Sequence, residues 1–351
     1  NPADGSIYEV PAVYADGHYR FTTSFEPLAS RLYLVTPERP EGVQPRPERT
    51  QPSRSRKLPS DGWSYTLNEP NVLVLDHADW QVKNGESGKN EFILTLDDNL
   101  RKLLGKEPRG GAMVQPWLRK QTAPEKVLDL ELTYHINVEE LPETDCLLAV
   151  ERPEFYTFEL NGKPLEIKIE RWWCDRALQC LKIPSERLHQ GDNRLILRGK
   201  YHENLPGLES MFLLGDFGVR NDTLVQQPDT LAVGDWTQQG FPYYAADITY
   251  SREIEVPENG AELEFPEWRG VLIGVRINGN KEQLLPWPPF RLKLSAGKIR
   301  LEITVYGSRR NAMGPFYCET PWPTWTGPDQ FKDRTSKTRQ LVPCGLLKPP
   351  V

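Results

Sequence analysis

Leu-Asp-Leu-Glu-Leu-Thr-Tyr-His-Ile-Asn-Val, residues 128–138, is the stretch that decides the fold. Every even-numbered position from Leu128 to Val138 is apolar, and the odd-numbered positions carry Asp, Glu, Thr, His and Asn. Because successive side chains of a β-strand point to opposite faces, this alternation predicts a strand with one buried and one solvated face. Such a strand is typical of an antiparallel sheet that covers a core on one side.

The surroundings of this strand recur later in the chain. LTY at 132–134 returns as ITY at 248–250, FELNGK at 158–163 returns as VRINGN at 275–280, and NRLIL at 193–197 matches IRLEI at 299–303. Asn-Gly pairs close hairpins because both residues accept positive φ. Each unit is about 100 residues long, which suits one β-sandwich domain.

We therefore expect an all-β chain in three parts. A β-rich N-terminal region covers 1–118 and contains a charged, proline-rich loop over 36–60; sandwich one covers 119–228 and sandwich two covers 229–351. The clearest helix signal is DDNLRKLLG at 97–105. It predicts a short helix that is capped by Asp97 or Asp98 and ended by Gly105.

The composition excludes several classes of protein. The 351 residues include 32 prolines, and proline disrupts helix interiors, so helical bundles, solenoids and (β/α)8 barrels are disfavoured. A net charge of −6 argues against a nucleic-acid partner, and no apolar run reaches the length that crosses a membrane. The five cysteines are interpreted as mostly buried thiols.

No cofactor or metal is expected. The five histidines do not stand at metal-ligand spacing with a second His or Cys, and His135 lies on the polar face of its strand. The chain also lacks the motifs of serine hydrolases, NTPases and dinucleotide-binding proteins.

Several stretches make the chain recognisable. The unit of strand, Asn-Gly-Lys turn, Trp-rich stretch and GDNRLIL resembles the galactose-binding-like jelly-roll module found in many glycoside hydrolases. Six further stretches resemble the C-terminal β region of family 2-like and α-L-rhamnosidase-like (family 106-like) hydrolases: NVLVLD at 71–76, RGGAMVQPW at 109–117, FLLGDFGV at 212–219, QGFPYYA at 239–245, RNAMGPF at 310–316 and WTGP at 325–328.

The resemblance implies tandem jelly-roll sandwiches without a catalytic site. In such hydrolases the catalytic acid and base sit on a separate domain, usually a barrel, upstream of the sandwiches. No stretch of this chain reads as that barrel, so the resemblance implies the non-catalytic part of an enzyme whose partner is the catalytic domain of the same parent chain. Asp175 and Asp216 are interpreted as buried, turn-fixing carboxylates, and no catalytic residue is predicted.

Aromatic and charged side chains in loops are candidates for carbohydrate binding, because exposed rings pack against the C–H faces of sugars. The candidates are Trp172, Trp173, Asp175, Tyr243, Tyr244, Trp287, Arg309, Arg310, Trp322 and Trp325. The alternative interpretation is that the aromatic rings pack between domains and that the arginines lie in a solvated or domain-bridging loop. If Trp172 and Trp173 lie in a strand, at most one of them faces the core.

Three functions remain open at this point. The first is the accessory region of a glycoside hydrolase, which positions the catalytic domain and helps to bind a polysaccharide or oligosaccharide. The second is an independent, lectin-like carbohydrate-binding protein, and the third is a structural module without a ligand. A complete small hydrolase ranks last.

Overall fold

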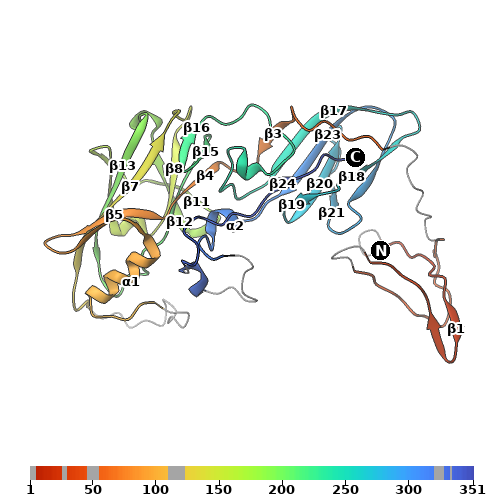
Figure 1. The fold of residues 1–351 in the computed structure, drawn as a ribbon, viewed down its shortest axis with the longest axis horizontal. Helices are drawn as coiled ribbons and strands as arrows, with labels where there is room; N and C mark the ends of the chain where they lie inside the picture. Colours follow the sequence, from red (N-terminus) through yellow and green to blue (C-terminus); the bar gives the residue numbers. More distant parts are fainter. Residues whose placement is uncertain (1–4, 26–29, 46–54, 110–122, 320–327, 333) are drawn as a thin grey trace.

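The chain folds into two β-sandwich-like bodies that lie side by side, with an N-terminal extension beyond them (Figure 1). The computed structural model describes residues 5–25, 30–45, 55–109, 123–319, 328–332 and 334–351. Most of the ordered elements are strands, which confirms the expected all-β class.

Sandwich one is built from two sheets around one core. The first sheet has the order β10-β9-β13-β7-β16-β15, and β7 also pairs with the β5–β6 hairpin. Its strands are β5 (His77–Val82), β6 (Ser87–Phe92), β7 (Leu128–Val138), β9 (Tyr156–Leu160), β10 (Lys163–Leu165), β13 (Gly191–Tyr201), β15 (Gly218–Arg220) and β16 (Thr223–Val225). All even-numbered residues of β7 are buried, as the alternation predicts.

The second sheet of sandwich one has the order β11-β12-β8-β14-β4 and is antiparallel throughout. Its strands are β4 (Asn71–Leu75), β8 (Cys146–Glu151), β11 (Ile169–Trp173), β12 (Asp175–Ile183) and β14 (Met211–Gly215). Every residue of β4 and β14 is buried, because other parts of the chain cover the outer face of this sheet as well.

The helix predicted at 97–105 is α1 (Ile93–Leu103), so the expected cap is wrong. The N-cap residue is Phe92, which provides no side-chain cap. Asp97 lies inside the helix, where its buried carboxylate accepts hydrogen bonds from the Tyr201 hydroxyl (2.7 Å) and the Leu208 N–H (2.9 Å). The predicted end is confirmed, since Gly105 follows the last turn at φ +71°.

Sandwich two has one large sheet of order β21-β20-β23-β17-β3 and two small ones, β18-β22 and β19-β24. The strands are β3 (Ser64–Leu67), β17 (Ile248–Val256), β18 (Ala261–Glu264), β19 (Trp268–Arg269), β20 (Leu272–Ile277), β21 (Gln283–Leu285), β22 (Arg291–Leu294), β23 (Gly297–Tyr306) and β24 (Gly345–Leu346). Its core contains two tryptophans that are fully buried, Trp63 and Trp236.

The internal repeat is confirmed by the sheet order, because β10-β9-β13-β7 of sandwich one corresponds to β21-β20-β23-β17 of sandwich two. The Asn-Gly turns match in detail. Asn161 and Asn278 have φ values of +52° and +51°, and the side-chain oxygen of each accepts the backbone N–H of the matching strand residue, Arg194 or Arg300.

The path of the chain interleaves the two sandwiches. β3 pairs with β17 of sandwich two, the next strand β4 pairs with β14 of sandwich one, and β5 pairs with β7. These strands precede residue 118, so part of the N-terminal region contributes to both sheets of sandwich one and to the large sheet of sandwich two. The boundaries at 118 and 228 concern independently folding units and stay predictions.

Two segments lie outside the sandwich sheets. The N-terminal extension carries the hairpin β1 (Val13–Ala15) and β2 (His18–Arg20). After β23 the chain forms α2 (Arg310–Met313) and packs Ala312, Phe316 and Tyr317 into the core of sandwich one before it returns to β24. The short 3-10 helices are η2 (Pro153–Phe155), η3 (Ser185–Arg187), η4 (Trp236–Gln238) and η5 (Pro328–Phe331).

The cysteines and the helices bear on two of the sequence expectations. All five cysteines are free, and all but Cys174 are buried, which confirms the interpretation as mostly buried thiols. None of the helices in the described ranges combines the length and the apolar character needed to cross a membrane.

Candidate functional site at the junction of the two sandwiches

Glu69 joins the two sandwiches, because it lies in the linker between β3 and β4 and binds a residue from each body. Its carboxylate accepts two hydrogen bonds from the Arg309 guanidinium (2.6 and 2.8 Å) and one from the Trp173 indole N–H (2.8 Å). The guanidinium also lies 5.3 Å from the Trp173 ring centre. Burial acts in the opposite direction, but these hydrogen bonds and the charge of Arg309 hold the pKa of Glu69 below its ordinary value.

The neighbouring tryptophans have opposite surroundings, as the strand geometry predicts. Trp173 is 4% exposed and packs on Phe212 at 5.0 Å between ring centres, so this ring serves packing at the junction. Trp172 is 53% exposed. Of the pair, only Trp172 offers a ring to a ligand.

The two carboxylates expected to be buried are exposed. Asp175 fixes a turn, as expected, since its side chain accepts the Ala177 N–H (2.8 Å), but it does so at the surface. Asp216 follows β14 at the edge of a groove and is also exposed. A turn needs no buried carboxylate where water reaches both partners, so the expectation of burial was wrong for both residues.

Tyr243 and Tyr244 are buried and hold segments of the chain in place. The Tyr244 hydroxyl accepts the backbone N–H groups of Asn68 (3.0 Å) and Glu69 (3.3 Å) and donates to the Asp247 carbonyl (2.8 Å), which fixes the linker that carries Glu69. Both rings therefore take part in packing.

The remaining candidates are scattered. Trp287 lies just beyond β21 and is 43% exposed. Arg310 is half-buried and donates to the Gln340 carbonyl (3.0 Å), within the segment that bridges the sandwiches. Trp322 and Trp325 lie outside the described residues.

A buried ion pair fixes the bridging segment to sandwich one. Asp76, whose side chain is fully buried, accepts hydrogen bonds from the Arg339 guanidinium and from His77 Nδ1 (2.8 Å). Arg339 also reaches Asp222 (2.6 Å) and the Tyr243 hydroxyl (2.5 Å). Burial would raise the pKa of Asp76, but hydrogen bonds from His77 and Arg339 and the charge of Arg339 lower it.

An open groove lies where the two sandwiches meet. Its walls come from both bodies and from the chain between them: Tyr65, Leu67, Asn68, Glu69, Pro70, Thr144, Asp145, Leu147, Leu214, Gly215, Asp216, Gln227, Pro228 and Asp229. The lining combines apolar leucine and proline surface with four carboxylates. Grooves at domain interfaces are a common place for ligands.

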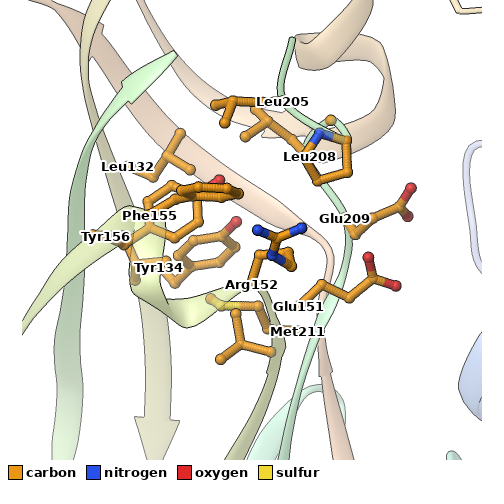
Figure 2. Close-up of a pocket in the computed structure, with 14 residues that line it drawn as sticks. Leu132, Tyr134, Glu151, Arg152, Phe155, Tyr156, Leu205, Leu208, Glu209 and Met211 are labelled. Atoms are coloured by element: carbon orange, nitrogen blue, oxygen red, sulfur yellow. The ribbon is translucent and has the colours of Figure 1, made fainter. Parts of the chain in front are cut away.

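A second, narrower pocket lies within sandwich one (Figure 2). The rings of Tyr134, Phe155 and Tyr156 line one end, and the side chains of Glu151 and Glu209 lie toward the other. Chain atoms that crowd around the Glu209 carboxylate and partly desolvate it, together with the Glu151 and Asp97 carboxylates, raise the pKa of Glu209 to about 7. The residue still has surface exposed to solvent, and water there screens part of this effect. The space holds about one or two water molecules, which excludes a sugar residue.

The sequence patterns missed several of these residues. Glu69 sits in an unremarkable Asn-Glu-Pro linker, and Glu151 and Glu209 are 58 positions apart in the chain, so no local spacing connects them. The expectation that the chain binds no metal stays a prediction. The described residues contain no group of three or more His, Cys, Asp or Glu side chains placed to hold a metal ion.

Comparison with known proteins gives only distant similarities. No protein-family model and no curated protein sequence matches the chain. Among solved structures, a β-D-mannosidase from Dictyoglomus thermophilum is 16% identical (TM-score 0.28; 73% of this chain and 32% of that chain covered). A rhamnosidase from Novosphingobium sp. PP1Y is 17% identical (TM-score 0.27; 65% and 21% covered).

Proteins that are not glycoside hydrolases are similar to the same degree. An anti-sigma factor domain-containing protein from Clostridium clariflavum is 13% identical, with a TM-score of 0.22 and coverage of 82% of this chain and 100% of that chain. The chain spans about a third of the mannosidase and a fifth of the rhamnosidase. Similarities this distant assign no activity.

Proposed function

We propose that this chain is a non-catalytic accessory region of a glycoside hydrolase, which holds a catalytic domain in position and contributes to carbohydrate contact. The observation that carries the proposal is the junction. Glu69, Arg309 and Trp173 connect the sandwiches at one point, and Asp76 and Arg339 connect them at another. A spacer that positions a second domain needs such fixed internal geometry, and the sequence resemblance to hydrolase β regions supports the same role.

The expected carbohydrate contact involves the exposed tryptophans. Trp172 and Trp287 present ring surface to solvent, whereas Trp173, Tyr243 and Tyr244 are taken up by packing. An exposed indole stacks on the C–H face of a sugar and excludes water there. The lectin-like alternative uses the same rings without a catalytic domain, and the structural alternative uses neither.

The reading frame that encodes these residues provides the first test. We expect it to encode a catalytic domain as well, and deletion of this region from the parent enzyme should lower both its melting temperature and its activity on polysaccharide. A reading frame without any catalytic domain would contradict the accessory role.

The isolated chain provides the second test. It should not hydrolyse a panel of aryl glycosides, because the pocket that holds Glu151 and Glu209 is too small for a sugar residue. Hydrolysis that disappears in Glu209→Gln would instead assign catalysis to the Glu151–Glu209 pair. On a glycan array, Trp172→Ala and Trp287→Ala should weaken any signal, and the exposed Leu284→Ala serves as the control.

A further inference from the structure

The N-terminal extension, residues 5–25 and 30–45, exposes an unusual amount of apolar surface. It supplies little more than a tenth of the described residues, yet it holds ten of the nineteen large apolar side chains that are exposed among them. None of its described residues belongs to the core of either sandwich, and it lies beyond both of them (Figure 1). Folded monomeric proteins rarely leave this much apolar surface uncovered, which indicates an interaction surface.

The segment RLYLV, residues 31–35, has the character of a strand but lies outside every sheet of the described chain. Its backbone groups make no hydrogen bond to any described residue. Tyr33 packs on Phe21 of the same extension, with 4.8 Å between ring centres, whereas Leu32 and Leu34 are 82% and 69% exposed. This alternation leaves a bare leucine face next to unpaired backbone groups, which are a template for pairing with another strand.

The β1–β2 hairpin adds aromatic surface to the same extension. Tyr14 and Tyr19 stand opposite each other across the hairpin, with 4.9 Å between ring centres, and both are mostly exposed. Because a large aromatic side chain can bury roughly 150–250 Å², the ten exposed side chains together offer on the order of 1,000 Å². One partner of a stable complex buries about 800 Å². The extension therefore exposes enough surface for one side of a stable dimer interface.

The charges of the extension permit two copies to meet. Its described residues include four acidic and three basic side chains, so the extension is close to neutral. Arg20 forms an ion pair with Asp16 (3.3 Å), and Arg39 forms one with Glu9 (3.1 Å). Two copies therefore do not repel each other. The extension also lacks the excess of lysine and arginine that attracts an apolar surface to anionic lipid.

We propose that two copies of this chain associate through their N-terminal extensions, with residues 31–35 of the two copies paired antiparallel. A twofold axis at Tyr33 places Leu32 of each copy opposite Leu34 of the other and gives the backbone groups partners. A second copy suits this surface because one segment supplies both the open strand edge and the apolar face. The inference goes beyond the proposed function, since it requires neither a catalytic domain nor a sugar.

Sedimentation velocity on the whole chain provides the first test. The chain should sediment as a dimer at about 50 µM, because interfaces of this size support micromolar or tighter affinity. Replacing both leucines, in Leu32→Lys/Leu34→Lys, should raise the dissociation constant at least about tenfold. The matched control, Leu141→Lys/Leu284→Lys, changes two exposed leucines of the sandwiches and should leave the dissociation constant unchanged.

A charge exchange tests the register. The Leu32→Lys/Leu34→Lys variant places like charges opposite each other at both leucine pairs, whereas Leu32→Glu/Leu34→Lys removes the same apolar area and places opposite charges there. Because cross-strand charges interact directly, the second variant should dimerise at least about fivefold more tightly than the first. Equal dissociation constants for the two variants would overturn the antiparallel pairing.

The other outcomes separate this inference from the accessory role. A chain that stays monomeric at 50 µM, or a dimer that persists unchanged in Leu32→Lys/Leu34→Lys, would overturn the association, while the reading frame would still decide the accessory role. A monomeric chain that binds phosphatidylcholine–phosphatidylserine vesicles and loses this binding in the same variant would overturn it as well and assign the extension to a membrane surface. The melting temperatures of all variants should equal that of the wild type, because the altered side chains lie outside both cores.

Discussion

A single arginine compensates the most deeply buried charge at the junction. Asp76 has a fully buried side chain, and its ion pair with Arg339 attaches the bridging segment to sandwich one. Replacing Arg339 by Met would leave that carboxylate without its cation. We expect a loss of about 3 kcal/mol in the free energy of unfolding, measured by urea denaturation. Arg194→Met, at an exposed position, should cost less than about 0.5 kcal/mol.

The same pair has a pH signature. The pKa of Asp76 is lowered by folding, so its contribution to stability is complete above the unfolded pKa of about 4 and is lost as the pH falls through the lower, folded value. The Asp76→Asn variant should therefore lose less stability than the wild type between pH 4 and pH 2. Equal slopes for the two proteins in that range would contradict the ion pair.

Glu209 should give the stability the opposite pH dependence. Its pKa is raised to about 7 in the folded chain, so the unfolded chain releases this proton first and stability falls as the pH rises from about 5 to 7. Because the side chain touches solvent, we expect only about 1 kcal/mol. Glu209→Gln should be more stable than the wild type by that amount at pH 8 and equal to it at pH 4, whereas the exposed Glu140→Gln should show no such difference.

At the level of elements, the two Asn-Gly turns allow a matched comparison. Asn161 makes three side-chain hydrogen bonds, to Arg187, Asn193 and Arg194, whereas Asn278 makes one, to Arg300. Both have positive φ, which costs an alanine about 1 kcal/mol. We expect Asn161→Ala to cost about 3 kcal/mol and Asn278→Ala about 2 kcal/mol, measured by thermal unfolding.

Glycine variants of the same turns separate the two causes. Gly adopts positive φ without strain, so Asn161→Gly and Asn278→Gly report only the lost hydrogen bonds. If the two glycine variants were equally stable, the extra hydrogen bonds of Asn161 would contribute nothing.

The elements are also where sequence reasoning worked best. Alternation located β7, and the two Asn-Gly pairs aligned the repeat, because strand periodicity and turn chemistry are local properties. The start of α1 was misplaced because tertiary contacts decide it. Asp97 reads as a cap by composition, yet Arg109, Tyr201 and Leu208 hold it inside the helix. The burial of β4 on both faces likewise depends on segments far away in the chain.

At the scale of the whole molecule, the Glu69–Arg309 pair should hold the two sandwiches in one orientation. We expect Arg309→Ala to widen the distribution of interatomic distances within the molecule, measured by small-angle X-ray scattering. The variant should also lower the free energy of unfolding by only about 1 kcal/mol, since both partners of the ion pair are partly exposed. The exposed Arg276→Ala should leave the scattering curve unchanged, and an unchanged curve for Arg309→Ala would show that other contacts suffice.

The candidate site could be predicted from sequence only in part. Exposed rings such as Trp172 follow from strand alternation, because one neighbour of a pair must face outward. The groove could not be predicted, since Asp145, Asp216 and Asp229 meet Asn68 and Glu69 only after two sandwiches dock. Residue type indicated which side chains suit a sugar, but packing decided which of them reach solvent.

The interleaved chain path has a consequence for synthesis. Ser64 in β3 and Ser251 in β17 are 187 positions apart, so at roughly 5–20 residues per second a ribosome separates these sheet partners by roughly 10–40 seconds. Sandwich one has all its strands between residues 71 and 225, so its strands can pair during this interval, while Ala312, Phe316 and Tyr317 join its core later. The Trp63 side chain is fully buried in the folded protein, so it stays exposed on the nascent chain until the strands of sandwich two have been synthesised. A version of the gene that begins at residue 229 would lack β3 altogether and would leave one side of β17 as an open strand edge, the kind of surface through which chains aggregate.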